Sequence, residues 1–333
     1  MSKFMKRTKS IGFISILMAI LLSVVFIVLS NISTDRMNTD EDYANQFRRD
    51  YSIYALPLPD SVSFAGESVP LELQDVREKF DREMLVNTYW QSQTLLFIKR
   101  SHRWFPVIEP ILAKHNIPDD FKYLALIESG FMDVVSPAGA VGFWQFMKDA
   151  GKQYGLTIND EIDERYHVEK ATEAACRYLL DAKAKFGSWT LAAASYNMGV
   201  SGLERQINLQ KATNYYDLLL NEETSRYVFR IVAAKTILNN PTRYGFHFRS
   251  EDLYTPFETR LYPITVSIDN FADFAFGMGI NYKALKYLNP WLRKEYLTVH
   301  KGDTVWIKLP KEPSSMKLVN DKSIIDQYNT TGQ

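Results

Sequence analysis

Apolar residues recur at helical spacing through most of the chain between residues 88 and about 245. Positions three and four residues apart share one face of a helix, so this spacing predicts helices with one buried face. The segments with this pattern are Leu95–Ile98, Phe105–Ala113, Phe121–Ile127, Trp144–Tyr154, Val168–Phe186, Trp189–Tyr196, Tyr215–Leu220 and Arg226–Leu238. Several end at a glycine, such as Gly130 or Gly187, and Pro241 follows the last, as expected for helix ends. We therefore predict a mainly α chain with an all-helical domain at residues 86–250.

The pattern changes over residues 257–312, where short segments replace the long helices. Arg260–Ser267 and Thr304–Leu309 are rich in β-branched residues, which favour strands. Two short helical stretches, Phe271–Phe276 and Tyr282–Leu288, lie between them. The order β-α-α-β predicts a second, small domain at residues 257–312, followed by a tail at residues 313–333.

The first thirty residues have the pattern of a membrane anchor. The segment 1–10 contains the basic residues Lys3, Lys6, Arg7 and Lys9. Ile11–Leu29 then runs without a charge, which approaches the length that a helix needs to cross a bilayer. No small-x-small cleavage pattern follows, so we favour a retained transmembrane signal anchor at residues 11–30 over a cleaved signal. The preceding basic residues predict a single pass, with segment 1–10 in the cytoplasm and the rest of the chain outside it.

Residues 31–85 form a linker and lead-in segment of mixed character. The first half is polar and charged, and Leu56–Asp60, with two prolines, is typical of extended chain. Val69–Leu73 has the composition of a short strand or of a segment that docks on the domain. Arg77–Arg100 has helical periodicity and leads into the helical domain.

Composition excludes several classes of function. The 39 basic and 39 acidic side chains give a net charge of zero, which does not indicate a nucleic-acid partner. The one cysteine, Cys176, cannot form an internal disulfide and lies too far from the N-terminus to carry a lipid anchor. The five histidines are scattered, and neither a metal-ligand pair nor a phosphate-binding glycine loop is present. We therefore expect no metal ion and no cofactor.

Glu128 departs most clearly from the helical pattern. Phe121, Leu124 and Ala125 form one apolar face of a predicted helix, and Glu128 occupies the next position on that face. The helix stops at Gly130, which places Glu128 at the negative end of the helix dipole. Burial and the dipole both favour the protonated carboxyl, which is the state of a general acid. Taken alone, the residue is also compatible with a structural role in which its carboxylate pairs with an arginine.

A turn-rich loop and an aromatic segment follow this helix. Ser136–Gly142 contains one proline and two glycines, and Phe143–Met147 comes directly after it. Glycines allow the backbone to approach a ligand closely, and the amide of Gln145 can both donate and accept hydrogen bonds. The loop therefore supplies groups suited to a polar ligand close in sequence to Glu128.

These residues and two later motifs resemble one known family. The first set consists of Glu128, Ser129, Ser136, Gly139, Gly142, Gln145 and Met147. It resembles the lytic transglycosylases of the soluble-lytic-transglycosylase type, relatives of goose-type lysozyme. Ser195–Gly199 resembles the family's Ala-Tyr-Asn-x-Gly, and Glu223–Val228 resembles its Glu-Thr-x-x-Tyr-Val, in the same order. In layout the chain resembles the membrane-bound lytic murein transglycosylase D group, which joins such a domain to C-terminal LysM modules.

The resemblance implies a lysozyme-like helical domain that cleaves the MurNAc-β-1,4-GlcNAc bond of peptidoglycan. In the family a single glutamate, here Glu128, first protonates the leaving oxygen and then takes a proton from the C6 hydroxyl of the same sugar. Intramolecular attack by that hydroxyl is chemically efficient and leaves a 1,6-anhydro-MurNAc end. The resemblance also implies a bacterial inner-membrane protein whose catalytic domain faces the periplasm and whose partners are peptidoglycan glycan strands.

Six further residues contact the substrate by the same resemblance. They are Ser136, Gln145, Met147, Tyr196, Asn197 and Tyr227. The resemblance implies that Gln145 forms a hydrogen bond with the sugar and that Tyr227 holds Glu128 or the sugar ring in place. Each also has a structural alternative: the methionine as a core residue, the tyrosines as buried hydroxyls and the asparagine as a helix end.

Two other segments resemble the family less closely. Asp163–Arg165 resembles its acidic turn, although helix capping and an ion pair are the more ordinary role for such residues. Asn281–Asn289 is the segment most similar to a LysM domain, yet Ile268–Asn270 replaces the usual Gly-Asp-Thr after the first strand. The small domain is therefore predicted to be LysM-like, with either glycan binding or a purely structural role.

Two alternatives to a transglycosylase remain open from the sequence. A hydrolytic lysozyme-type muramidase would use the same scaffold, with water attacking in place of the C6 hydroxyl. A non-catalytic peptidoglycan-binding scaffold protein would keep the fold without the reaction. The presence of Glu128 argues against the scaffold protein.

Overall fold

The computed structural model describes residues 40–50 and 53–312. The chain divides into two compact units, residues 1–55 and residues 56–333, which are described separately. The described helix of the first unit is α2 (Asp40–Asp50). Three acidic residues lie in its first turn, where the positive end of the helix dipole stabilises their negative charge. The anchor predicted at residues 11–30 and the tail 313–333 lie outside the described residues. Within the ranges described, no helix is both long and apolar enough to cross a bilayer.

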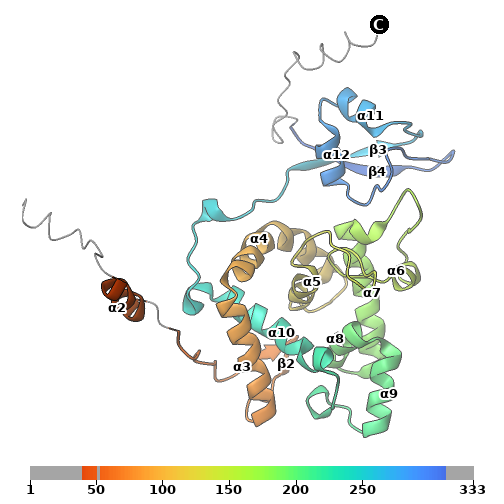
Figure 1. The fold of residues 1–333 in the computed structure, drawn as a ribbon. Coiled ribbons are helices and arrows are strands. Elements are labelled where there is room, and N and C mark those ends of the chain that lie inside the picture. The colour runs from red at the N-terminus through yellow and green to blue at the C-terminus, as the bar shows by residue number, and fades with distance from the viewer. Residues whose placement is uncertain (1–39, 51–52, 313–333) are drawn as a thin grey trace, which may run out of the picture. The chain divides into compact units, whose positions relative to one another are not determined.

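The second unit begins with a helical domain, as the apolar periodicity predicts (Figure 1). Its α-helices are α3 (Gln74–Tyr89), α4 (Gln91–Lys114), α5 (Phe121–Ser129), α6 (Lys148–Gln153), α7 (Val168–Phe186), α8 (Trp189–Met198), α9 (Val200–Gln210) and α10 (Glu222–Asn239). Short 3-10 turns are η1 (Glu164–Tyr166), η2 (Tyr215–Asp217), η3 (Pro241–Tyr244) and η4 (Ser250–Asp252). The mainly α prediction is therefore confirmed.

Two local predictions differ from the structure, and one helix was not predicted. The segment Trp144–Tyr154 is helical only within α6, because residues 142–145 form turns that include the fully buried Trp144. Tyr215–Leu220 contains a single 3-10 turn. Helix α9, with Leu203 buried and Ile207 packed against the core, was not predicted, because its apolar positions form only a short and sparse pattern.

Helix α5 lies at the centre of the domain, packed against α4 and α10 (Figure 1). Phe121, Leu124, Ala125 and Leu126 are fully buried. Burial of each large apolar side chain contributes about 1.5–3 kcal/mol to folding, so α5 is firmly held by its packing. Gly130 ends the helix with a φ of +60°, and its N–H donates to the carbonyl of Leu126.

The lead-in segment is part of this domain. Strands β1 (Ser63–Phe64) and β2 (Glu67–Ser68) pair as an antiparallel hairpin, and the ring of Phe64 lies 5.0 Å from that of Phe121. Val69–Leu73 forms no strand; Val69 and Leu71 are buried in the core, so the docking alternative is the one observed. The hairpin is thereby packed directly against α5.

The carboxylate of Glu67 caps helix α8. It accepts hydrogen bonds from the backbone N–H groups of Trp189 (2.7 Å) and Thr190 (2.9 Å), and from the hydroxyls of Ser188 (2.7 Å) and Thr190. Burial alone would raise the pKa of Glu67, but the hydrogen bonds from Thr190 and Trp189 outweigh it and lower that pKa. One acidic side chain of the lead-in segment thus satisfies the free donors at the start of α8.

Residues 257–312 form the predicted β-α-α-β unit, hereafter the C-terminal module. Its elements are β3 (Thr259–Ile264), α11 (Phe271–Gly277), α12 (Tyr282–Leu288) and β4 (Val305–Pro310). The strands are antiparallel, with Thr259 opposite Pro310 and Ile264 opposite Val305. The buried Asn289 joins α12 to β4, because its side-chain amide accepts from the N–H and donates to the C=O of Lys308, both at 2.7 Å.

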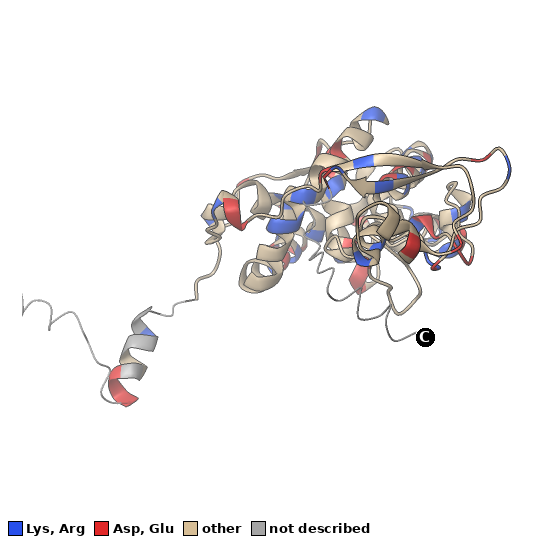
Figure 2. Ribbon diagram, turned by 90° about the horizontal axis from the view of Figure 1, so that it is seen from above, with Lys and Arg blue, Asp and Glu red and all other residues tan. Residues whose placement is uncertain are grey.

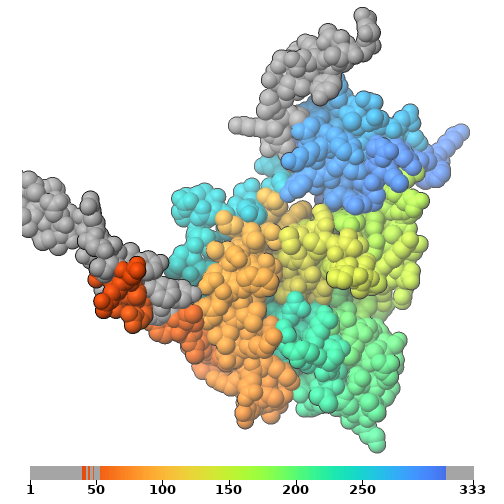
Figure 3. All heavy atoms as spheres, viewed as in Figure 1, coloured from red at the N-terminus to blue at the C-terminus, as the bar shows by residue number. Residues whose placement is uncertain are grey.

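The core of the C-terminal module includes two residues of the helical domain, Val141 and Tyr166. The backbone of Asp163 donates to the carbonyl of Trp291 (2.9 Å), and that of Arg293 donates to the carbonyl of Glu161 (2.7 Å). The two parts therefore share packing and backbone hydrogen bonds, and Figure 3 shows their atoms in direct contact. Figure 2 shows basic and acidic residues interspersed along the ribbons of this unit.

We predict that Glu67→Gln lowers the free energy of unfolding by about 1–3 kcal/mol, because donors at the start of α8 lose a charged acceptor. Thermal unfolding at pH 7 measures this change, and Glu72→Gln, which replaces an exposed glutamate, is the matched control. Because the pKa of Glu67 is lowered in the folded state, its stabilisation is present above the unfolded pKa and is lost as the pH falls through the folded value. Equal stability of the two variants at pH 7 would contradict the capping role.

Candidate active site

Glu128 lies in the last turn of α5, with its side chain half-buried. The hydroxyl of Tyr227 donates a short hydrogen bond to its Oε1. Burial raises the pKa of Glu128 above its usual value, although the bond from Tyr227 and the positive charge of Arg230 act in the opposite direction. Arg230 is held in place by a hydrogen bond from its Nη2 to the carbonyl of Ile127 (3.1 Å). Burial thus favours the protonated carboxyl, and two neighbouring groups stabilise its anion.

Two tyrosines from different helices lie near this carboxyl. Tyr227, on α10, is fully buried, and Tyr196, on α8, donates to the carbonyl of Trp144 at 2.7 Å. Burial raises the pKa of both tyrosines well above the usual value, and the negative charge of Glu128 adds to the effect. Both phenols therefore remain protonated hydrogen-bond donors over the working pH range.

Asn197 joins the end of α8 to the start of α10. Its Nδ2 donates to Oε1 of Glu223 (2.8 Å), and its Oδ1 accepts from the hydroxyl of Thr224 (2.7 Å). Asn197 therefore connects two helices through its side chain, in addition to lying near the end of α8. Glu223 also helps raise the pKa of Glu128 by its negative charge. The sequence placed Glu223 within a motif but gave no reason to assign it this electrostatic effect.

Ser136 and Gln145 hold the loop between α5 and α6. The hydroxyl of Ser136 accepts from the N–H of Ala140 (3.0 Å), and Nε2 of Gln145 donates to the carbonyl of Gly142 (2.7 Å). Gln145 has a φ of +49°, an uncommon conformation for a residue with a side chain. These contacts stay within the loop, and among the described residues neither side chain is hydrogen-bonded to Glu128.

Met147 is 47% exposed, so the structural alternative that placed it in the core is wrong. It is the last residue before α6, in extended conformation. Met132 (39% exposed) and Val135 (58% exposed) lie on the preceding part of the same loop. Exposed apolar side chains are therefore present on both sides of the turn at residues 136–142.

Ser129 ties the end of α5 to this loop. Its hydroxyl donates to the carbonyl of Phe143 (3.0 Å) and accepts from the N–H of Phe131 (3.1 Å). Trp144, next in the chain, is anchored by a hydrogen bond from its Nε1 to the hydroxyl of Thr172 (2.8 Å). The residue after Glu128 thus fixes the position of the loop that follows it.

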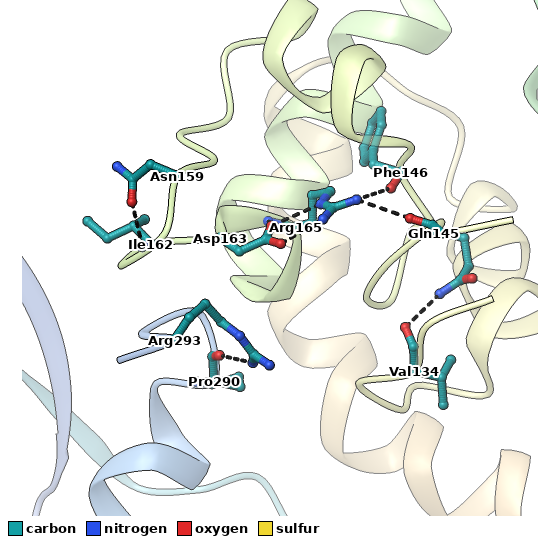
Figure 4. A network of polar contacts seen from close by, with 10 residues as sticks. Val134, Gln145, Phe146, Asn159, Ile162, Asp163, Arg165, Pro290 and Arg293 are labelled. Carbon is teal, nitrogen blue, oxygen red and sulfur yellow. Dashed lines mark hydrogen bonds and ion pairs between the residues drawn. The ribbon is translucent and has the colours of Figure 1, made fainter. Parts of the chain in front are cut away.

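Arg165 holds the same loop from the other direction (Figure 4). Its guanidinium pairs with Asp163 (2.7 and 2.9 Å) and donates from Nη1 to the carbonyls of Gly139 and Phe146, both at 3.2 Å. The Arg165–Asp163 pair is almost fully buried, and removal of one partner of such a pair costs about 3–5 kcal/mol. The ion-pair role considered for the acidic turn is confirmed.

Gly142 lies against the backbone of Arg165. A Cβ built on Gly142 would be 2.1 Å from the carbonyl oxygen of Arg165, and its φ is +77°. Gly139 also has a positive φ, +86°, but has open space around it. Residue 142 must therefore be glycine because a side chain has no room there. At residue 139 only the positive φ favours glycine.

A cavity of about 400 Å³ lies elsewhere, between the helical domain and the C-terminal module. Phe131, Asp133 and Phe143 line it, whereas Glu128, Tyr196 and Tyr227 do not. Burial raises the pKa of Asp133 to about 6, partly offset by the charge of Arg293. In the described ranges, no cluster of three or more His, Cys, Asp or Glu side chains is positioned to hold a metal ion.

Comparisons with known proteins find relatives for both parts of the second unit. Residues 106–219 match the family described as Transglycosylase SLT domain, and residues 260–313 match the Soluble lytic transglycosylase C-terminal LysM-like domain. The chain is 27% identical over 265 residues to proteins named Membrane-bound lytic murein transglycosylase D from Escherichia coli strain K12 and from Escherichia coli O6:H1. The similarity covers 77% of this chain and 57% of each relative, so the chain spans little more than half the relatives' length. Tyr227 lies beyond the matched range of the SLT domain.

We predict that Gly142→Ala destabilises the protein by about 2–5 kcal/mol, because the new methyl group overlaps the backbone of Arg165 and the residue keeps a positive φ. Gly139→Ala is the control, with a cost of about 1 kcal/mol from its backbone conformation alone. Chemical denaturation of the two variants measures the difference. Equal destabilisation would show that the close approach to Arg165 does not constrain the loop.

Proposed function

We propose that this chain is a lytic transglycosylase acting on peptidoglycan, because it carries a transglycosylase SLT domain followed by a LysM-like domain. The single observation that carries the proposal is the half-buried Glu128, hydrogen-bonded to Tyr227 at the end of the central helix, with a raised pKa. A carboxyl in this state can give up a proton to a leaving oxygen and afterwards exist as a stabilised anion.

The proposed reaction uses Glu128 twice. First its proton passes to the bridging oxygen of the MurNAc-β-1,4-GlcNAc bond, which breaks and leaves positive charge at C1 of the muramic sugar. The carboxylate then takes the proton of the C6 hydroxyl, whose oxygen forms a bond to C1 and closes the 1,6-anhydro ring. Glu128 ends protonated, so no water is consumed and the enzyme is restored. The N-acetyl carbonyl of the same sugar is suited to stabilising the charge at C1.

Tyr227 and Arg230 are proposed to adjust the acidity of Glu128. Because the Tyr227 hydroxyl donates to Oε1, the second oxygen, Oε2, is the one available to carry the proton to the substrate. Burial favours the acid needed for the first step, whereas the Tyr227 bond and the Arg230 charge favour the anion needed for the second. A group that must both give and take a proton works best when these influences are close to balance.

The substrate contacts are proposed from position on the loop and helices. Tyr196 and Asn197 lie at the end of α8, and the exposed Met147 can pack against a sugar face. The amide oxygen of Gln145 accepts no hydrogen bond from the described residues, and the hydroxyl of Ser136 still has a proton to donate. These groups could bind the hydroxyl and N-acetyl groups of the glycan.

We also propose the chain layout expected from the sequence: an anchor at residues 11–30, a lead-in at 31–85, a catalytic domain at 86–250 and a LysM-like domain at 257–312. The anchor would hold the protein in the inner membrane with the catalytic domain on the periplasmic side. The name of the relatives, which describes them as membrane-bound, supports this placement.

We predict that Glu128→Gln reduces the release of soluble fragments from purified sacculi by about 10³-fold or more, because glutamine has no proton to donate. Glu72→Gln, an exposed glutamate substitution, should retain full activity and serves as the control. Mass spectrometry of the products distinguishes the alternatives, since an anhydro end is lighter by one water than the end left by a hydrolytic muramidase. Equal solubilisation by Glu128→Gln and the parent would exclude Glu128 as the acid.

We predict that Tyr227→Phe moves the basic limb of the pH profile of kcat/KM to higher pH by about one to two units. The Tyr227 hydrogen bond lowers the pKa of Glu128, so its removal raises that pKa and keeps the acid protonated to higher pH. Tyr215→Phe is the matched control, because Tyr215 is also buried and donates to the carbonyl of Thr224. If the basic limb of the pH profile is unchanged in Tyr227→Phe, or moves equally in both variants, this role of Tyr227 is contradicted.

A further inference from the structure

The cavity between the helical domain and the C-terminal module has a composition suited to a charged ligand. Its volume of about 400 Å³ lies in the range of sites for small ligands. Both parts contribute to its wall, the helical domain with Arg100, Arg103 and Trp104 and the C-terminal module with Tyr287 and Trp291. The site is therefore complete only when the two parts are packed together, as they are in this structure (Figure 3).

The cavity begins directly after the proposed acid in the chain. Phe131, Met132 and Asp133, which follow Glu128, line it, and so does Phe143, whose carbonyl accepts the hydrogen bond of Ser129. The same short segment thus borders the proposed catalytic carboxyl and the cavity. A substrate chain bound at Glu128 could place a side branch here.

The two arginines of the wall are held by hydrogen bonds to backbone carbonyls. Arg100 donates from Nη1 to the carbonyl of Gly130 (3.1 Å), and Arg103 donates from Nε to the carbonyl of Thr255 (2.9 Å). Among the described residues, neither guanidinium takes part in an ion pair. Each has five N–H donors, so most of them remain available to a ligand.

The other charged groups of the wall compensate these arginines only in part. Lys308 pairs with Glu169; burial would raise the pKa of Glu169, but the His167 and Lys308 contacts outweigh it and lower that pKa to about 2. Asp133 is the remaining acid of the wall, and with a pKa of about 6 it is largely ionised at pH 7, so one further carboxylate is present for two guanidinium groups. Since the whole chain has no net charge, this local excess of positive charge is a specific property of the cavity.

Aromatic rings complete the wall and hold one arginine in position. The guanidinium of Arg103 lies 4.2 Å from the ring centre of Phe257 and 5.1 Å from that of Tyr254. This stacking fixes the planar guanidinium of Arg103 in an orientation that allows it to bind a carboxylate through two parallel hydrogen bonds. Neutral sugars would leave both arginines without a counter-ion, whereas a peptide with free carboxylates would satisfy them.

We propose that this cavity binds the carboxylate-bearing peptide stem attached to peptidoglycan, with Arg100 and Arg103 holding a carboxylate and the aromatic rings packing against the peptide. The inference rests on the proposed function for the identity of the substrate. It adds a site for the peptide branch, shared between the two domains, to the glycan-cleaving site at Glu128.

Calorimetric titration of the detergent-solubilised full chain with the tripeptide L-alanyl-γ-D-glutamyl-meso-diaminopimelate tests this site. Binding should weaken about tenfold or more in Arg100→Gln and in Arg103→Gln, and Arg103→Lys should recover only part of the affinity. Arg177→Gln is the matched control, since Arg177 also donates to a backbone carbonyl but lies outside the cavity. Thermal unfolding of each variant identifies any loss of affinity that reflects loss of the fold.

Two ligand controls define the chemistry. The same peptide with its carboxylates amidated, and a neutral GlcNAc oligosaccharide, should show no dependence on Arg100 or Arg103. Equal binding of the free and amidated peptides, or equal weakening in Arg177→Gln, would overturn the proposal, as would tripeptide affinity that is unchanged in both cavity variants.

The Glu128→Gln variant separates this inference from the proposed function. It should bind the tripeptide as tightly as the parent, because the cavity does not include Glu128. Loss of glycan cleavage in Glu128→Gln together with absent tripeptide binding in the parent would overturn only the peptide site. Full cleavage by Glu128→Gln with arginine-dependent tripeptide binding would overturn the proposed mechanism and leave the peptide site standing.

Discussion

A carboxyl group inside a helical core is the constraint around which this structure is built. Glu128 continues the apolar face of α5, so its environment must compensate a group that prefers water. The compensation comes from α10, through the hydroxyl of Tyr227 and the charge of Arg230. Because α10 is fixed by its own packing against α3 and α5, the geometry of the site depends on the whole helical core.

The loop beside this carboxyl is held by buried polar groups. Ser129 fixes it to the end of α5, and Arg165 donates to a carbonyl in its middle (Gly139) and to one near its end (Phe146). Buried ion pairs contribute little net stability but strongly favour one geometry when every partner is satisfied. The Arg165–Asp163 pair therefore acts mainly to define the conformation of the loop, at a place where several carbonyls would otherwise lack donors.

The C-terminal module takes part in this support. Val141, from the middle of the loop, and Tyr166, next to Arg165, belong to the module's hydrophobic core. Removing the module would expose these residues and free one side of the loop. A module whose sequence departs from the usual LysM pattern at residues 268–270 thus has a clear structural role, and it also forms part of the wall of the proposed peptide site.

The sequence by itself determined the helical domain, the β-α-α-β module and the unusual position of Glu128. Those features follow from short-range periodicity and from helix-ending residues, which act within a few positions of the chain. The tertiary structure decided the partners: Tyr227 meets Glu128 across 99 residues, and Arg165 meets Gly139 across 26. It also turned Met147 outward, delayed the helix predicted from Trp144 until Lys148 and left Arg100 and Arg103 lining a cavity. Such contacts depend on how distant helices pack, which local spacing cannot specify.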